Sequence, residues 1–211
     1  MAASTTTTEV GLVNEALQML GEKTITALSD SNDRAEAANL FYANVRDEVT
    51  RAHNWNCAMV TETLDTPDGT DPEWGYSSRF ALSDLTYTCL RVVRTDDLDI
   101  SWRVQGGYLH TDESEINIRY LRQMSDDAGV ADMDPLMRRA VAAKLAMTLA
   151  LRLSASDERL RNVAAVYDQA VADASHADAI EMSPHSIGPS LFEEVRVGDK
   201  GFRPIIPYED Y

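Results

Sequence analysis

The spacing of apolar residues along the chain changes twice. Apolar residues recur every three or four positions near 9–20 and 33–53, which is typical of helices with one buried face. Alternating and aromatic segments then fill the stretch near 76–122, and helical spacing returns near 135–152 and 157–180. The pattern predicts an α+β fold: a four-helix bundle with an antiparallel β-meander or small barrel inserted between the second and third helices.

The ends of the first two predicted helices carry capping residues. Thr7 or Thr8 can cap the first helix, and Gly21 follows it where a left-handed residue commonly ends a helix. One of residues 30–32 begins the second helix, and Trp55 beyond its end is predicted to pack the base of the bundle. The expected buried stripe of the second helix is Ala38, Phe41, Val45, Val49 and Ala52. Its expected polar side comprises Arg34, Glu36, Asn39, Arg46, Asp47 and Glu48.

The third and fourth predicted helices differ in how much of their circumference is apolar. Asp134 and Pro135 begin the third helix, because proline is well tolerated at the first helical position, and Ser154 or Ser156 caps the fourth. The third helix is apolar over much of its circumference, so we expect it to be central. Its broad face is Leu136, Ala140, Val141, Leu145, Leu149 and Leu153, and that of the fourth helix is Leu160, Val163, Tyr167, Ala170, Val171 and Ala174.

The strand-like segments of the middle region are short and separated by turn residues. They comprise residues 59–64, 78–82, 89–94, 101–104, 107–110 and 116–121. Trp102 and Val104 alternate with polar residues, as do Ile116 and Ile118, which indicates strands with one buried face. Two glycines in the segment 105–107 can adopt positive φ, so this segment is predicted to form a hairpin turn.

These patterns divide the chain into parts. Residues 1–58 and 130–181 form the helical bundle, residues 59–129 the β-rich insertion, and residues 182–211 an extended C-terminal arm. The arm is interrupted by prolines and glycines, yet it is far more apolar than solvated segments usually are. We favour an arm that docks on a neighbouring subunit or partner; the alternative is an arm folded back on its own domain. The expected partner-binding residues are Leu191, Phe192, Val195, Phe202, Ile205, Ile206, Tyr208 and Tyr211.

The chain is strongly acidic. Its formal net charge is −16 at pH 7, and it has 16 arginines but 3 lysines. Sequence-reading DNA binding is disfavoured, because duplex binding requires basic side chains that displace condensed counterions. An acidic channel wall, in contrast, would let DNA slide without adhering. The excess of arginine is consistent with interface use, since arginine forms bidentate pairs, or with genomic composition or adaptation to salt.

The sequence contains no familiar catalytic motif. Phosphate-binding loops, dinucleotide fingerprints, zinc-protease helices and nucleophile elbows have no match. The four histidines are scattered without ligand spacing, and His53 is interpreted as a helix-end residue. Acidic residues gather near 68–73, 112–115 and 126–134, which we interpret as solvated loop charge, with a weak cation site as the alternative. We therefore expect no enzymatic activity, no cofactor and no metal.

The remaining composition predicts a soluble protein made in the cytoplasm. Cys57 and Cys89 belong to no Cys/His cluster and are expected to be free thiols in a reducing compartment. Residues 1–8 lack the basic and apolar regions of a signal peptide. No apolar run approaches the roughly 20 residues that span a bilayer, so no membrane partner is expected.

Several segments carry a resemblance to a known family. They are Phe80-Ala-Leu-Ser-Asp-Leu85, Cys89-Leu-Arg-Val-Val-Arg94, Trp102-Arg-Val-Gln-Gly-Gly-Tyr-Leu109 and Ile116-Asn-Ile-Arg-Tyr120, preceded by Val13-Asn-Glu-Ala-Leu17, Leu20-Gly21 and Trp55. Over residues 9–180 the chain resembles the tail tubular protein A family, the head-to-tail adaptors of short-tailed bacteriophages. It is also similar to uncharacterised phage proteins of the same layout. The shared motifs are packing and turn motifs, and that family has no catalytic signature.

The resemblance implies a structural virion protein of the tail or neck. Copies of the chain would form a dodecameric ring between the portal protein and the tail nozzle protein. The ring would extend the channel for DNA ejection and would contact passing DNA without sequence-specific binding. The arm, from Leu191 onward, would reach along the portal or an adjacent subunit. A free subunit that is monomeric and forms the ring only on a template is compatible with this role.

Three other functions are alternatives to this role. A head-completion adaptor of a long-tailed phage would share the helical packing. A cell-wall hydrolase could use the loop carboxylates Asp71, Glu73, Asp112 and Glu115, and its turnover would have to be lost when they are replaced by alanine. A ligand-binding module would need a deep apolar pocket in the β-rich insertion.

Overall fold

The computed structural model describes residues 7–69, 72, 75–95, 100–153 and 156–181. The chain divides into two units, Met1–Ala179 and Ile180–Tyr211. The second unit is described only at Ile180 and Glu181, which end a helix. The predicted arm, residues 182–211, therefore lies outside the described residues.

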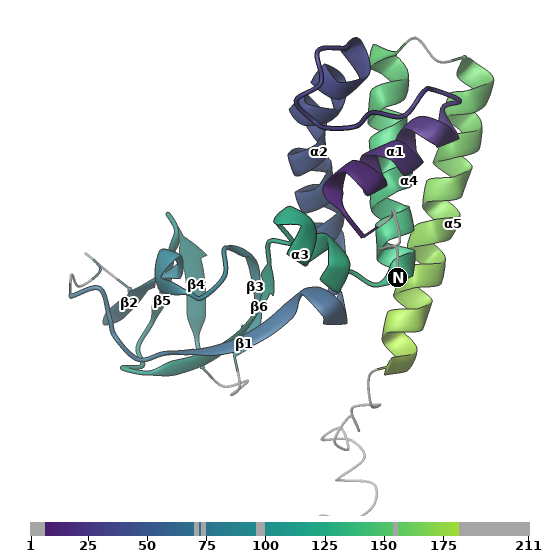
Figure 1. The fold of residues 1–211 in the computed structure, drawn as a ribbon. Coiled ribbons are helices and arrows are strands. Elements are labelled where there is room, and N and C mark those ends of the chain that lie inside the picture. The colour runs from purple at the N-terminus through teal and green to yellow at the C-terminus, as the bar shows by residue number, and fades with distance from the viewer. Residues whose placement is uncertain (1–6, 70–71, 73–74, 96–99, 154–155, 182–211) are drawn as a thin grey trace, which may run out of the picture. The chain divides into compact units, whose positions relative to one another are not determined.

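The described residues form an α+β fold, as the sequence predicts (Figure 1). Its helices are α1 (Glu9–Met19), α2 (Asp33–Ala52), α3 (Asp126–Asp132), α4 (Pro135–Arg152) and α5 (Asp157–Glu181). Its strands are β1 (Met59–Leu64), β2 (Ser78–Ala81), β3 (Cys89–Thr95), β4 (Trp102–Gln105), β5 (Tyr108–Thr111) and β6 (Ile116–Arg122). All these strands lie between α2 and α3 in the sequence, as predicted.

Both ends of α1 are fixed by local hydrogen bonds. The Thr8 hydroxyl accepts a hydrogen bond from the Gly11 amide at 3.0 Å, so Thr8 is the N-cap. At the other end, the amides of Gly21 and Glu22 donate to the carbonyls of Gln18 and Leu17, both at 2.9 Å. This is a Schellman motif, and Gly21 has the φ of +71° that it requires. The predicted caps of α1 are confirmed.

The other predicted helix starts are also confirmed. Asn32 caps α2 by accepting from the Ala35 amide, and Asp134 caps α4 by accepting from the Leu136 amide. Ser156 precedes α5 and accepts from the Arg159 amide at 3.4 Å. The alternative cap, Ser154, lies outside the described residues.

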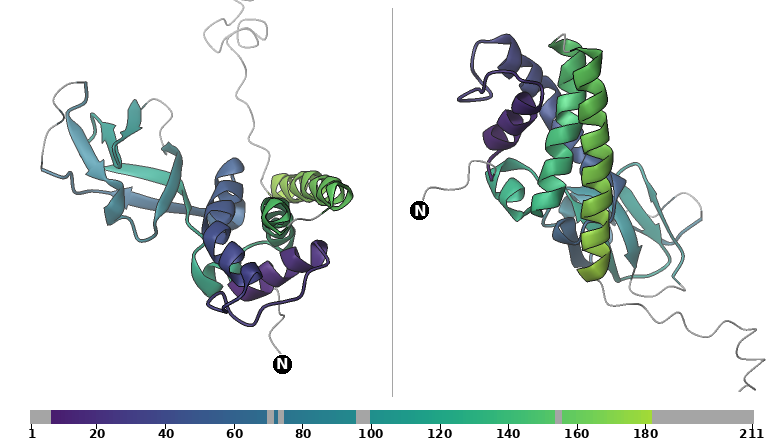
Figure 2. Two further views of the ribbon diagram at one scale, coloured as in Figure 1. Left: turned by 90° about the horizontal axis from the view of Figure 1, so that it is seen from above. Right: turned by 90° about the vertical axis from the view of Figure 1, so that its right-hand side faces the viewer.

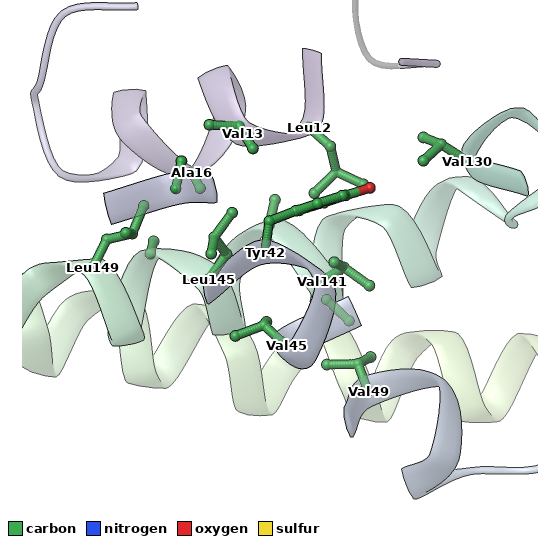
Figure 3. Close-up of a cluster of buried hydrophobic side chains, with 14 of the residues drawn as sticks. Leu12, Val13, Ala16, Tyr42, Val45, Val49, Val130, Val141, Leu145 and Leu149 are labelled. Carbon is green, nitrogen blue, oxygen red and sulfur yellow. The ribbon is translucent and has the colours of Figure 1, made fainter. Parts of the chain in front are cut away.

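One hydrophobic cluster joins the helices, and α4 supplies much of it. Leu145 and Leu149 of α4 point toward Val13 and Ala16 of α1 and Val45 of α2 (Figure 3). The predicted central position of α4 is consistent with the burial of its alanines, Ala140, Ala142, Ala143, Ala146 and Ala150. α5 packs beside α4, and every residue of its predicted face is buried in or packed against the cluster (Figures 1 and 2).

The expected stripe of α2 is partly wrong. Ala38, Val45 and Val49 are buried, but Phe41 is only half-buried and Ala52 is exposed. Tyr42 and Arg46 are buried instead. The reason is that α2 contacts both α1 and α4, so its covered face is wider than a single stripe and extends toward α1.

The short helix α3 was not predicted from the sequence. The sequence predicts that its first residues, Asp126 and Asp127, are solvated loop charges. The Asp126 carboxylate instead accepts from the Gly129 amide at 3.0 Å, and Asp127 accepts from the Glu9 amide at 2.8 Å. Val130 of α3 is buried in the helical cluster. The helix crosses the predicted domain boundary at 129/130, and the division into domains stays a prediction.

The β-rich region forms two small antiparallel sheets rather than one meander or barrel. One sheet has the strand order β1-β6-β3 and the other β2-β5-β4. The hairpin between β4 and β5 turns at Gly106 and Gly107, which have φ of +60° and +83°, as predicted. The inner faces of the two sheets share a second hydrophobic cluster, which includes Phe80, Leu109 and Ile118. Val104, predicted to be buried, is 43% exposed because β4 is an edge strand.

Strand β6 belongs to both hydrophobic clusters. Tyr120 is buried in the cluster between the two sheets, and Leu121, the next residue, is buried in the helical cluster. Neighbouring residues of a strand face opposite sides of the sheet, so one strand can contribute to two cores. β6 also pairs with β1, with Met59 opposite Leu121. The strands that enter and leave the β-rich region are therefore neighbours.

Candidate functional site

The partner-binding residues predicted from the sequence all lie in the arm. Leu191, Phe192, Val195, Phe202, Ile205, Ile206, Tyr208 and Tyr211 are outside the described residues. Their role therefore stays a prediction, and the other candidate surfaces belong to the rest of the chain.

The last turns of α5 are fastened to the segment between α2 and β1. The Asp178 carboxylate accepts from the Asn56 amide at 2.8 Å and lies 3.2 Å from Nε2 of His53. The Asn56 side-chain amide donates to the Asp178 carbonyl at 3.0 Å. His53 also packs edge-on against Trp55, whose Nε1 donates to the Val49 carbonyl. Trp55 is buried as predicted, and His53 is a helix-end residue as interpreted.

Arg46 anchors a polar network between α1, α2 and the end of β6. Its guanidinium lies 3.5 Å from Glu9 and 2.9 Å from Asp47, and the side chain is 5% exposed. Asp47 accepts in turn from the Gln123 side chain at 2.6 Å. Tyr42 lies beneath the guanidinium, and burial is the main cause that raises the pKa of its hydroxyl. This network is the reason that Arg46 lies in the interior.

A shallow cleft of about 650 Å³ lies along the outer face of the β2-β5-β4 sheet. The strand register places Arg79, His110 and Arg103 directly opposite one another across three strands. Arg79 is engaged internally, since it pairs with Asp68 at 2.5 Å and stacks on the Tyr108 ring at 4.5 Å. Polar groups line the cleft, so it differs from the deep apolar pocket that a ligand-binding module would need.

In the β-rich region the basic residues lie on strands, and most acidic residues lie in the segments that connect them. Every Lys or Arg between residues 59 and 125 lies on a strand, at Arg79, Arg91, Arg94, Arg103, Arg119 and Arg122. Among the strand residues, the one carboxylate is Glu62; the other acidic residues of this region lie in its connecting segments. The charged residues of the strands are therefore mostly basic, within a strongly anionic protein. This separation can be read from the sequence, because most of these arginines fall within the predicted strand segments and most carboxylates fall between them.

The outer face of the β1-β6-β3 sheet carries an unusual pair of like charges. Arg94 of β3 lies directly opposite Arg119 of β6, and Arg119 donates to the Thr61 hydroxyl at 3.4 Å. Arg91 donates to the Asn54 side chain, and Arg51 donates to the Leu90 carbonyl. Within the described part of the chain, none of Arg51, Arg91, Arg94 and Arg119 forms an ion pair. We call these four residues the arginine face.

The acidic residues singled out from the sequence are largely used to hold the fold. Asp68 pairs with Arg79, and Asp132 pairs with Arg122. Asp112 accepts from the Ser77 amide at 2.9 Å, and Asp134 caps α4. Asp71 and Glu73 lie outside the described residues. Within the described residues, no three His, Cys, Asp or Glu side chains are grouped so that they could hold a metal ion.

Both cysteines are free and half-buried. Burial is the main cause that raises the pKa of both thiols, and a protonated thiol is a poor nucleophile. The Cys57 thiol lies 3.5 Å from the sulfur of Met137. Among the described helices, none combines the length and apolar character that crossing a membrane requires.

No protein-family model matches this chain, and none of the curated proteins matches it.

Proposed function

We propose that the protein is a structural head-to-tail adaptor of a phage virion, which forms a ring between the portal protein and the tail nozzle. In this role α1, α2, α4 and α5 act as a four-helix bundle that packs between copies. The β-rich insertion meets a neighbouring ring, and residues 182–211 dock as an arm. The protein performs no reaction, and DNA passes along the ring without sequence-specific binding.

The observation that carries the proposal is the way the β-rich region is built into the helices. Its entering and leaving strands, β1 and β6, are paired, and it has its own hydrophobic cluster. Leu121, in turn, fixes it to the helical cluster. A ring subunit needs one element for lateral packing and a second, firmly attached element for the next ring. The fold offers both.

Charge adds a second argument. With a net charge of −16, free copies repel one another, so self-association in free solution would be weak and a template would favour closure of the ring. The polar contacts of Asp178 hold the last turns of α5, directly before the proposed arm. A fixed base would reduce the conformational entropy that the arm loses on docking.

Native mass spectrometry of the protein mixed with a portal ring tests the proposal. We expect a stable complex with several copies bound to each portal ring. If no complex forms at any salt concentration, the proposal is wrong. A chain lacking residues 190–211 should remain folded but lose portal attachment. A large fall in its melting temperature would instead show that these residues complete their own subunit.

A further inference from the structure

The arginine face costs stability in the isolated subunit. Like charges directly opposite each other in an antiparallel pair are destabilising, and Arg94 and Arg119 are such a pair. The chain has 35 acidic residues to draw on, yet none of the described ones is paired with either arginine. Arg119 is exposed and Arg94 is half-exposed, so both can be reached by a partner. This arrangement indicates that the counter-charge comes from another molecule.

The outward side of α5 offers a matching surface on a second copy. From Asn162 to Glu181 this helix contains no Lys or Arg. Ala165, Ala172 and Ala179 are exposed and spaced by seven residues, so they form one ridge along the helix. Asp168 and Asp173 lie on either side of that ridge and are also exposed. Small residues permit close approach, and the flanking carboxylates can receive guanidinium groups.

A compact acidic surface fits the arginine face better than a nucleic acid does. The segments that join the strands are rich in carboxylates, including Asp65, Asp84 and Glu115. A duplex presents many phosphates along an extended surface, and any phosphate that comes within about 8 Å of these carboxylates is repelled with little screening. A single helix can place two carboxylates at the arginines without extending over the loops. Arginine also pairs with carboxylates in a bidentate way.

We propose that the arginine face of one copy binds the outward side of α5 on the next copy. The surfaces differ, so the contact is head-to-tail and can close into a ring. The inference rests on the proposed ring and adds one lateral contact to the packing of the bundles: the outer face of the β1-β6-β3 sheet against α5 of the next copy. The rest of the insertion stays available for the neighbouring ring. It does not depend on the portal or on the arm.

Charge reversal in the full-length chain tests this contact. One variant carries Arg94→Glu and Arg119→Glu, and the other carries Asp168→Arg and Asp173→Arg. Sedimentation of the wild type over a wide concentration range should show salt-sensitive self-association. Each variant alone should associate at least about tenfold more weakly, because like charges then meet at the contact. An equimolar mixture of the two variants should recover association, since opposite charges meet again.

The matched control is Arg103→Glu, which reverses an exposed strand arginine on the other sheet and should leave association unchanged. The single change Arg119→Glu adds a second readout. It would place a carboxylate opposite Arg94, so the melting temperature should rise while association falls. A fall in melting temperature would contradict the argument from like charges.

Four results would overturn the inference. The first is a wild type that stays monomeric at every concentration and salt concentration, and the second is a charge-reversal variant that associates as strongly as the wild type. The third is an equimolar mixture of the two variants that does not recover association. The fourth is a labelled DNA duplex that binds the wild type but not Arg94→Glu/Arg119→Glu. The DNA result would assign the face to phosphate. Portal binding without self-association would remove this contact but keep the adaptor role. Self-association without portal binding would keep this contact but remove the adaptor role.

Discussion

Asp178 is expected to be the residue of α5 whose loss most weakens the attachment of its last turns. Asp178→Ala removes the acceptor of the Asn56 amide, and losing a charge-assisted hydrogen bond costs about 1.5–3 kcal/mol. The His53 pair adds at most about 0.5 kcal/mol, because the His53 side chain is 32% exposed. We expect a total loss of about 2–3 kcal/mol, or a fall in melting temperature of about 4–12 °C for a chain of this length.

Thermal unfolding followed by circular dichroism measures this loss, and hydrogen exchange localises it. Amides in the last turns of α5 should exchange faster in Asp178→Ala than in the wild type. Asp178→Asn keeps an oxygen acceptor and should cost about 1 kcal/mol or less. Asp173→Ala is the matched control, since Asp173 is exposed and, among the described residues, its side chain accepts a hydrogen bond from Gln169 of its own helix and from no other residue. If Asp178→Ala were no more destabilising than Asp173→Ala, the reasoning would be refuted.

Three further substitutions test other parts of the fold. Gly129→Ala would place a Cβ 2.5 Å from the carbonyl carbon of Met124, so α3 must shift; we expect a loss of about 1–3 kcal/mol in denaturant unfolding. Arg46→Met leaves Glu9 and Asp47 without their cation; because both partners are about a quarter exposed, we expect about 2 kcal/mol rather than the larger cost of a fully buried pair. Burial is the main cause that raises the pKa of Glu15, against the opposing influence of Arg139 and Arg138. The folded state therefore binds this proton more tightly than the unfolded state, and stability is lost as the pH rises through the folded pKa. Glu15→Gln should raise the melting temperature at neutral pH but not below the unfolded pKa of glutamate, and an equal effect at both pH values would contradict this account.

Local signals in the sequence were sufficient for most element boundaries. The Schellman end of α1 at Gly21, the Asp134-Pro135 start of α4 and the two-glycine turn at 106–107 depend on a few neighbouring residues. Such features can be predicted because the conformation they require is specific to those residue types. The α+β class followed from the two changes of apolar spacing.

Features set by distant contacts could not be predicted in the same way. Arg46 looked like a solvated residue, because nothing near it in the sequence shows that Glu9 would lie beside it. The strand order β1-β6-β3 likewise depends on pairing between segments far apart in the chain. The candidate arm residues lie outside the described part. The arginine face was missed because cross-strand register decides that Arg94 and Arg119 are neighbours.

Strand β6 has a mechanical consequence. Tyr120 is buried in one hydrophobic cluster and Leu121 in the other, so β6 couples the two clusters mechanically. A force applied along β6 would therefore act on both hydrophobic clusters at once. In a single-molecule stretching experiment, the sheets and helices should therefore come apart in a single rupture rather than in two.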